Sequence, residues 1–140
     1  MSDRLMSEMD RAFIAGLIEG RGRVEIRHAT NTRGSYDQIR LCFDKLGAET
    51  IEWLRAKIPA LKVESATRPQ RCYLLSFHAS ALFVEAHPYL HDKKAHAKLV
   101  WKWVRTFPLK GIALTEESRA LRAEVEKQLA LLREGVSCSA

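Results

Sequence analysis

The sequence predicts an α+β fold with a four-stranded antiparallel sheet. Apolar residues change twice from helical spacing to alternation along the chain, so the expected order is helix, two strands, helix, two strands and then further helices. The chain has 140 residues, of which 46% are hydrophobic, and this suffices for one core of ordinary size. We therefore expect a single domain over residues 1–134 and a frayed tail over 135–140.

The first helix is expected to begin at Ser7, which forms a variant of the capping box with Asp10. Its broad apolar face consists of Phe13, Ile14, Leu17 and Ile18. Gly16 and Gly20 lie four residues apart and therefore stack on one side of the helix. A glycine inside a helix costs about 1 kcal/mol relative to alanine, and close approach of another backbone is the usual compensation. The alternative is a core helix packed on its own sheet, with Gly20 or Gly22 as its C-cap.

A strand pair follows this helix. Side chains alternate over 23–30 and again over 36–43, on either side of a turn at 31–35. One side of the pair is apolar, and the other carries Arg23, Glu25, Arg27, Gln38 and Arg40. The pattern predicts a hairpin with one half-buried face and one polar, mostly basic face.

Spacing, proline and glycine place the remaining elements. We expect a helix over 48–58, strands over 61–66 and 71–77, and helices over 78–86, 93–107 and 114–134. The strand over 71–77 has an ambiguous phase. Either Tyr73, Leu75 and Phe77 face the core, or Cys72, Leu74 and Ser76 do.

The net charge of +6 and the isoelectric point of about 9.5 suit a polyanionic partner. The excess of bases lies in residues 21–40 and 91–110. No run of about 18 apolar residues predicts a transmembrane helix, and the first residues lack the pattern of a signal peptide. The three cysteines form no CxxC pair, which disfavours a zinc knuckle or a disulfide framework. These features favour an intracellular protein, in a bacterial cytoplasm or an organelle matrix, with no membrane partner.

Residues 14–22 have the sequence I-A-G-L-I-E-G-R-G, which resembles the LAGLIDADG motif of homing endonucleases and their DNA-binding relatives. Seven or eight of the nine positions are acceptable to the motif. The exception is Arg21, which stands where the family has its metal-binding carboxylate. A second segment, 88–100, is similar to another recurrent segment of the family, and there Lys93 is the counterpart of the catalytic-pocket lysine.

The resemblance extends over nearly the whole chain and implies an αββαββα fold with C-terminal helices. It also implies a homodimer in which two motif helices pack at a two-fold axis and deliver one carboxylate each to the scissile phosphates. The residues at that dimer interface would be Phe13, Ala15, Gly16, Leu17 and Gly20. The implied cofactor is Mg²⁺, if the protein cleaves DNA.

Hydrolysis of a DNA phosphodiester needs an activated water and stabilisation of charge on the phosphate, and carboxylate-bound Mg²⁺ supplies both. Arg21 cannot bind Mg²⁺ and stays protonated. It either stabilises the negative end of its helix or contacts a phosphate. Lys93 would be a second phosphate contact or an exposed lysine of a first helical turn. Glu19 is the candidate catalytic residue and metal ligand, with Glu25 as an alternative, although two residues along a helix rotate Glu19 by about 200° from Arg21.

The family resemblance implies that the concave face of the sheet lies along the major groove of DNA. The residues expected to face it are Arg23, Glu25, Arg27, Asn31, Gln38, Arg40 and Asp44 from the first hairpin, and Lys62, Glu64, Arg68 and either Gln70 or Arg71 from the second. Arginine and lysine suit guanine, amides suit adenine, and carboxylates accept from cytosine. An ordinary solvated sheet face is the alternative interpretation.

These observations predict a sequence-specific double-stranded DNA-binding protein of the LAGLIDADG type, a homodimer on a long pseudo-palindromic site, with cleavage lost or impaired because of Arg21. The first alternative is an active Mg²⁺-dependent homing endonuclease that makes double-strand breaks. The second is a dimeric domain that binds RNA or a protein.

Overall fold

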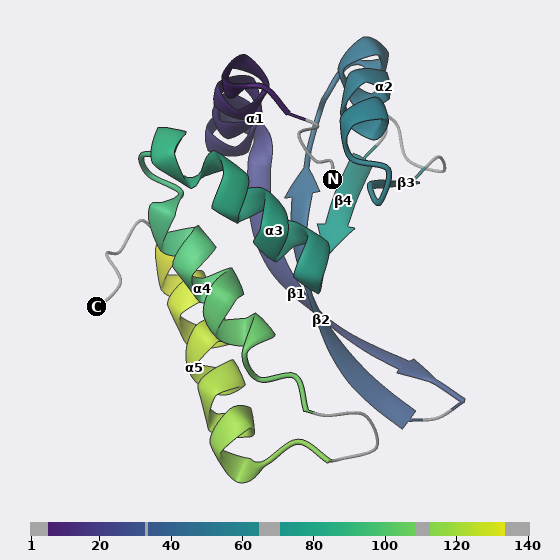
Figure 1. Cartoon of the computed structure of the whole chain (residues 1–140). Coiled ribbons are helices and arrows are strands. Elements are labelled where there is room, and N and C mark those ends of the chain that lie inside the picture. The colour runs from purple at the N-terminus through teal and green to yellow at the C-terminus, as the bar shows by residue number, and fades with distance from the viewer. Residues whose placement is uncertain (1–5, 33, 65–70, 109–112, 134–140) are drawn as a thin grey trace.

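The computed structural model of the chain describes residues 6–32, 34–64, 71–108 and 113–133 (Figure 1). In chain order the elements are α1 (Glu8–Arg21), β1 (Gly22–Asn31), β2 (Gly34–Phe43), α2 (Ala48–Lys57), β3 (Lys62–Glu64), β4 (Arg71–Leu75), α3 (Ser76–Ala86), the short 3-10 helix η1 (His87–Tyr89), α4 (Lys94–Val104) and α5 (Glu116–Arg133). The predicted α+β class is confirmed. The expected tail, 135–140, lies outside the described residues, and a single domain over 1–134 stays a prediction.

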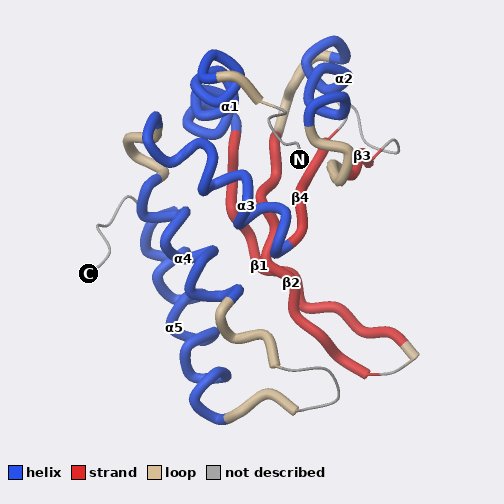
Figure 2. The backbone as a smooth tube through the Cα atoms, in the orientation of Figure 1, coloured by secondary structure: helices blue, strands red, loops and turns tan. Residues whose placement is uncertain are grey.

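The sheet is antiparallel throughout and has the strand order β1-β2-β4-β3. β1 and β2 pair along their whole length, from Gly22 opposite Phe43 to Asn31 opposite Gly34. β4 pairs only with residues 40–43 of β2. Residues 26–31 and 34–39 therefore pair with each other alone, and we call them the distal arm. Figure 2 shows this two-stranded arm extending away from the body of the molecule.

The core lies between one face of the sheet and the helices. All five α-helices and the strands β2 and β4 contribute to its largest fully buried side chains, which are Ile14, Ile18, Ile39, Leu41, Phe43, Leu54, Leu74, Phe83, Leu90, Val100, Trp103 and Leu129. β1 and α2 add the buried side chains of Val24 and Ile51. α3 packs across this face of the sheet, and α4 and α5 pack beside it (Figure 1).

The helix α1 begins as predicted. The Ser7 Oγ accepts a hydrogen bond from the Asp10 N–H at 3.1 Å, and the Asp10 carboxylate accepts one from the Ser7 N–H at 3.3 Å. At the other end Gly22 is the C-cap, and its N–H donates to the Ile18 carbonyl. A Cβ at Gly22 would lie 2.6 Å from the Ile18 oxygen, so only glycine lets the chain turn here from helix into strand.

The strand β4 differs from its predicted extent. Cys72 and Leu74 are fully buried, which decides the phase that the sequence left open. The strand ends at Leu75, and Ser76 and Phe77 belong to α3. Buried Ala79, Leu82, Phe83 and Ala86 give α3 a helical apolar face, and this tertiary packing overrides the alternation at 76–77. Within the described residues, no helix is both long and apolar enough to cross a bilayer.

Candidate nucleic-acid interface

The strand register gathers the predicted DNA-contacting residues on one face of the sheet. Residues directly opposite each other in an antiparallel pair point to the same side. The pairs Arg23 with Cys42, Glu25 with Arg40 and Arg27 with Gln38 extend this side across β1 and β2, and Tyr73 continues it to Lys62. We call this side the polar face; its members are Arg23, Glu25, Arg27, Gln38, Arg40, Asp44, Lys62, Glu64, Arg71 and Tyr73.

Two of the residues predicted for this face, Asn31 and Arg68, have no described side chain. Asn31 ends β1 and pairs with Gly34, so its backbone lies at the tip of the distal arm. Arg68, like the alternative Gln70, lies outside the described residues. Arg71, the other alternative, is exposed on β4 opposite Glu64.

A connected network of charges holds the arginines of the polar face. The Arg23 Nε donates to Asp44 Oδ2 at 3.0 Å, and its Nη1 donates to Glu25. Glu25 also accepts from Arg27 Nε at 3.3 Å, and Arg71 Nε lies 3.5 Å from Asp44 Oδ1. The network therefore joins β1 to β4 through the residue that follows β2. It fixes where three guanidinium groups stand before any partner binds.

The pKa shifts show that this network stays ionised at neutral pH. The hydrogen bond from Arg23 lowers the pKa of Asp44. Burial alone would raise the pKa of Glu25, but hydrogen bonds from Arg23 and Arg27 and their positive charge outweigh it, and the net shift is downward. Beneath them burial raises the pKa of the Cys42 thiol to about 12, so this group is neutral.

Arg40 is held in a different way. Its Nε and Nη2 donate to Gln38 Oε1 at 3.3 and 3.0 Å, and its Cζ lies 4.2 Å from the centre of the Tyr73 ring. A planar guanidinium stacked on a ring keeps one orientation. Sequence reasoning missed Tyr73 because the phase of its strand was ambiguous, although its register partner Cys42 lies on the predicted polar side.

Arg21 ends α1 at the edge of this face. It is exposed, and its carbonyl accepts a hydrogen bond from the Asp44 N–H at 3.1 Å. The end of the motif helix is thereby tied to the point where β2 ends. Within the part of the chain that the structure describes, the exposed side chain of Arg21 has no ion pair or hydrogen bond.

The Glu19 carboxylate faces away from Arg21 toward the backbone that precedes α4. Its Oε2 accepts from the N–H groups of His91 at 2.6 Å and Lys93 at 3.1 Å, and its Oε1 accepts from that of Asp92 at 3.2 Å. Burial would raise the pKa of Glu19, but these three bonds and the charge of Lys93 outweigh it and lower the pKa. The structure thus brings the two predicted residues Glu19 and Lys93 together, with Glu19 holding the loop that carries Lys93.

One face of α1 is largely exposed; among the described residues, Phe13 on this face packs against Trp53 of α2. Phe13 is 50% exposed, and added Cβ atoms at Gly16 and Gly20 would meet nothing within 4 Å. Packing among the described residues therefore does not require glycine at positions 16 and 20. Leu17 is half-buried beside them, but Ala15 differs from the prediction: it is 1% exposed, so its side chain packs in the core of its own chain.

No protein-family model and no curated protein matches the chain. Solved structures do. The homing endonuclease I-CvuI, in complex with the I-CreI target in the presence of Mg and with the DNA not cleaved, superposes with a TM-score of 0.72 at 14% identity, over 94% of this chain and 87% of that one. The archaeal intron-encoded homing endonuclease I-Vdi141I, complexed with DNA, superposes with a TM-score of 0.70 at 10% identity, over 95% and 87% of the two chains.

The chain has the LAGLIDADG homing endonuclease fold. The LAGLIDADG meganuclease I-AabMI, bound to uncleaved DNA, matches it at a TM-score of 0.62 and 13% identity, over 92% of this chain but 50% of the meganuclease. One copy of this LAGLIDADG fold therefore corresponds to about half of that longer protein. The predicted αββαββα order with C-terminal helices is confirmed.

The residues at the end of α1 in this LAGLIDADG fold do not suit Mg²⁺. The last motif position before Gly22 holds a cation, Arg21, and the oxygens of Glu19 already accept three backbone amides. The alternative ligand Glu25 is bound by two arginines. Among the described residues of one chain, no group of three His, Cys, Asp or Glu could hold a metal ion.

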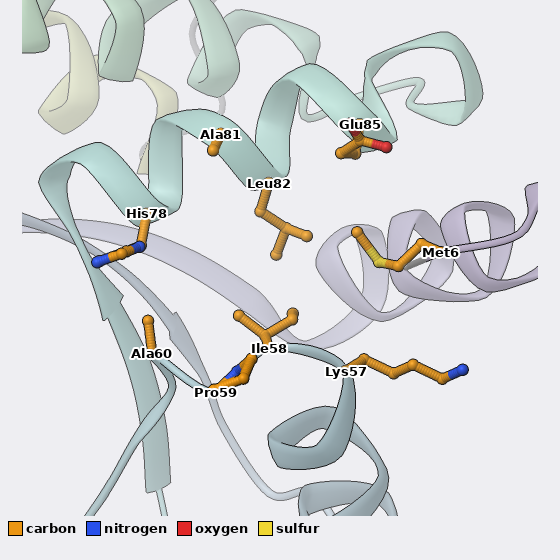
Figure 3. A pocket seen from close by; sticks show the side chains of 9 residues that line it. All are labelled: Met6, Lys57, Ile58, Pro59, Ala60, His78, Ala81, Leu82 and Glu85. Atoms are coloured by element: carbon orange, nitrogen blue, oxygen red, sulfur yellow. The ribbon is translucent and has the colours of Figure 1, made fainter. Parts of the chain in front are cut away.

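A cavity of about 420 Å³ lies elsewhere in the fold, between the segment that precedes α1, the end of α2 with the residues that follow it, and α3 (Figure 3). Its wall is largely apolar and is formed by Met6, Lys57, Ile58, Pro59, Ala60, His78, Ala81, Leu82 and Glu85. None of these residues belongs to the polar face. The cavity is therefore separate from the candidate site.

Proposed function

We propose that the chain is a sequence-specific double-stranded DNA-binding protein, which acts as a homodimer on a long pseudo-palindromic site and in which Arg21 abolishes or impairs cleavage. The observation that carries the proposal is the charge network of the polar face. Its arginines are held in place by Glu25 and Asp44. A guanidinium held in one orientation can form directed hydrogen bonds to a base edge, whereas a mobile charge is enough for a phosphate contact.

The dimensions of the hairpin fit a major groove, which admits a two-stranded ribbon. The ten residues of β1 span about 30 Å at roughly 3.3 Å per residue. That length corresponds to about nine base pairs at roughly 3.4 Å each. Each half of a two-fold site would then contain about nine base pairs along β1 alone. Complexes of I-CvuI and I-Vdi141I with DNA support the use of this fold for duplex binding.

The exposed face of α1 supports the homodimer. Phe13, Leu17 and the two glycines lie on one side of the helix, where a second helix could approach its backbone closely. Phe13 also packs edge-to-face on Trp53 of α2, with ring centres 5.1 Å apart, so its ring is already oriented. A dimer about this helix would place two polar faces in line along one duplex.

The same dimer would bring two Arg21 side chains to its centre. Two guanidinium groups raise the local positive potential, which repels a metal ion and attracts a phosphate. We infer that Arg21 contacts a phosphate at the middle of the site and that Lys93, held by Glu19, contacts another. In the alternative, an active Mg²⁺-dependent endonuclease, Glu19 or Glu25 would have to exchange its present hydrogen-bond partners for the metal.

The test is a selection of bound duplexes from a randomised DNA library by the purified protein, with sequencing of the bound fraction. We expect enrichment of a two-fold-symmetric site, and an affinity that falls steeply with salt while the preference over random duplex persists. The control is Lys127→Ala, an exposed cation of α5 that lies off the polar face. Enrichment of no DNA site, or tighter binding to single-stranded or A-form RNA, would refute the proposal.

A further inference from the structure

The distal arm has a second face, opposite the polar face. On this face His28 of β1 lies opposite Asp37 of β2. The His28 Nδ1 is 2.6 Å from Asp37 Oδ1, and its Nε2 is 3.0 Å from Glu126 Oε2. Glu126 belongs to α5, 98 residues away in the chain. Ile39 packs in the core and Ile26 packs against it at the base of the arm, and beyond them the His28 imidazole links the arm to α5.

Both ring nitrogens of His28 face carboxylate oxygens, which can only accept hydrogen bonds. A neutral imidazole donates from one nitrogen, whereas the imidazolium donates from both. The contact therefore requires protonated His28. The hydrogen bonds to Glu126 and Asp37 raise the pKa of His28 above its ordinary value of 6.5. A further charged group at this junction is Arg122 of α5. Burial lowers the pKa of its guanidinium, and the negative charge of Asp37 partly opposes this shift.

The helix α5 is a firm support for the arm. Val125 and Leu129 are buried in the core. The Arg122 Nε donates to the buried Thr106 Oγ1 at 2.6 Å, and its Cζ lies 4.6 Å from the centre of the Trp103 ring. A group fixed by α5 therefore has a defined position relative to the rest of the sheet.

We propose that the contact between His28 and Glu126 is a positioning element, which holds the distal arm against α5 and so sets how the arm meets the outer base pairs of each half-site. This inference rests on the proposed DNA-binding function. Neither residue belongs to the polar face, so neither would touch the bases. They act through Arg27 and Gln38, which stand on the opposite face of the same arm.

The arm reaches only the outer part of the site. At roughly 3.3 Å per residue, residues 26–31 lie about 13 to 30 Å from the start of β1. This range corresponds to about the fourth to the ninth base pair from the end of α1, at roughly 3.4 Å per base pair. A two-stranded ribbon without further support is marginally stable and twists freely. Base contacts tolerate only a few tenths of an ångström, so the support of the arm matters for discrimination.

The experiment compares Glu126→Gln with Glu117→Gln, a matched substitution at an exposed position of the same helix. Amide hydrogen exchange of residues 26–30 and 35–39 is measured on the free protein, and base preference is measured by selection from a randomised duplex library. For Glu126→Gln we expect faster exchange in the arm and about two- to five-fold weaker discrimination at outer positions only, because His28 is 59% exposed and its ion pair is screened. The Glu117→Gln protein should match the unmodified one in both measurements.

The pH dependence gives an independent measure. Because the pKa of His28 is raised, the contact is present at low pH and is lost as the pH rises through that pKa. Outer-position discrimination should therefore weaken with rising pH in the unmodified protein and stay constant in Glu126→Gln.

Three outcomes would overturn the inference. Unchanged exchange in Glu126→Gln would show that the contact does not hold the arm. An equal loss at inner and outer positions would show a global effect. Faster exchange with unchanged discrimination at the outer positions would show that base preference does not depend on how the arm is held. If the unmodified protein enriches no site, the proposed function fails, and so does the proposed effect of the contact on base discrimination. The exchange measurement still shows whether the contact between His28 and Glu126 holds the arm.

Discussion

The anchor formed by Glu19 leads to a prediction about stability. In Glu19→Gln the three N–H donors of residues 91–93 keep only one amide oxygen, and the NH2 group of the glutamine faces donors instead of acceptors. Hydrogen bonds to a charged group contribute about 1.5–3 kcal/mol each at most, and an unsatisfied donor costs about 1–3 kcal/mol. The site is partly exposed, so we expect a net loss of about 1–3 kcal/mol of unfolding free energy.

A loss of this size lowers the melting temperature of a chain of this length by about 4–10 °C. The measurement is thermal unfolding by circular dichroism at pH 7, with Glu52→Gln on the exposed side of α2 as the control, for which we expect no more than about 0.5 kcal/mol. Because the pKa of Glu19 is lowered below its ordinary 4.5, the anchor stabilises the fold above that pH and is lost as the pH falls through the lowered pKa. The melting temperatures of the unmodified protein and Glu19→Gln should therefore converge in acid. Equal melting temperatures at pH 7, or a gap that does not shrink in acid, would refute this account of Glu19.

Three further predictions concern the motif helix and the polar face. Gly22→Ala places a Cβ 2.6 Å from the Ile18 carbonyl oxygen, so thermal unfolding should show a loss of about 1–3 kcal/mol; an unchanged melting temperature would contradict the tight turn. Gly16→Leu has open space within one chain, so the fold should survive, but analytical ultracentrifugation should show a monomer; a stable dimer would remove α1 from the interface. Arg40→Lys keeps the charge but loses the planar group stacked on Tyr73. Its preference for the selected site should fall by about 1–3 kcal/mol, with binding to random duplex unchanged; an equal loss on both would assign Arg40 to phosphate.

The polar face could be predicted from the sequence because alternation over eight residues in each of two strands admits only one assignment of sides. A slip of one residue would bury Arg23 and Arg27 and expose Val24 and Ile26, so the burial of Val24 confirms the assignment. The strand β4 is half as long, and its apolar residues occur on both sides. Its phase therefore depended on packing against the helices, which the local pattern does not contain.

The contacts of single charged side chains could not be predicted. Glu19 binds backbone amides 72–74 residues away, and the sequence says only that it follows the apolar part of the motif. His28 contacts Glu126, which is 98 residues away in the chain, because α5 packs against β1. The sequence did place Gly16 and Gly20 together on one side of α1, since that follows from helical geometry alone. The sequence did not show that the side chain of the neighbouring Ala15 would be buried in the core.

We propose that this LAGLIDADG fold binds a symmetric duplex and does not cut it, because Arg21 stands where the family has its metal-binding acid. The most direct measurement is cleavage of the selected duplex by the unmodified protein, Arg21→Asp and Arg21→Ala, each with Mg²⁺, with Mn²⁺ and with EDTA. We predict that the unmodified protein and Arg21→Ala bind without cutting and that Arg21→Asp gains metal-dependent cutting. Metal-dependent cutting by the unmodified protein would refute this proposal and would make Glu19 and Glu25 the first metal ligands to test.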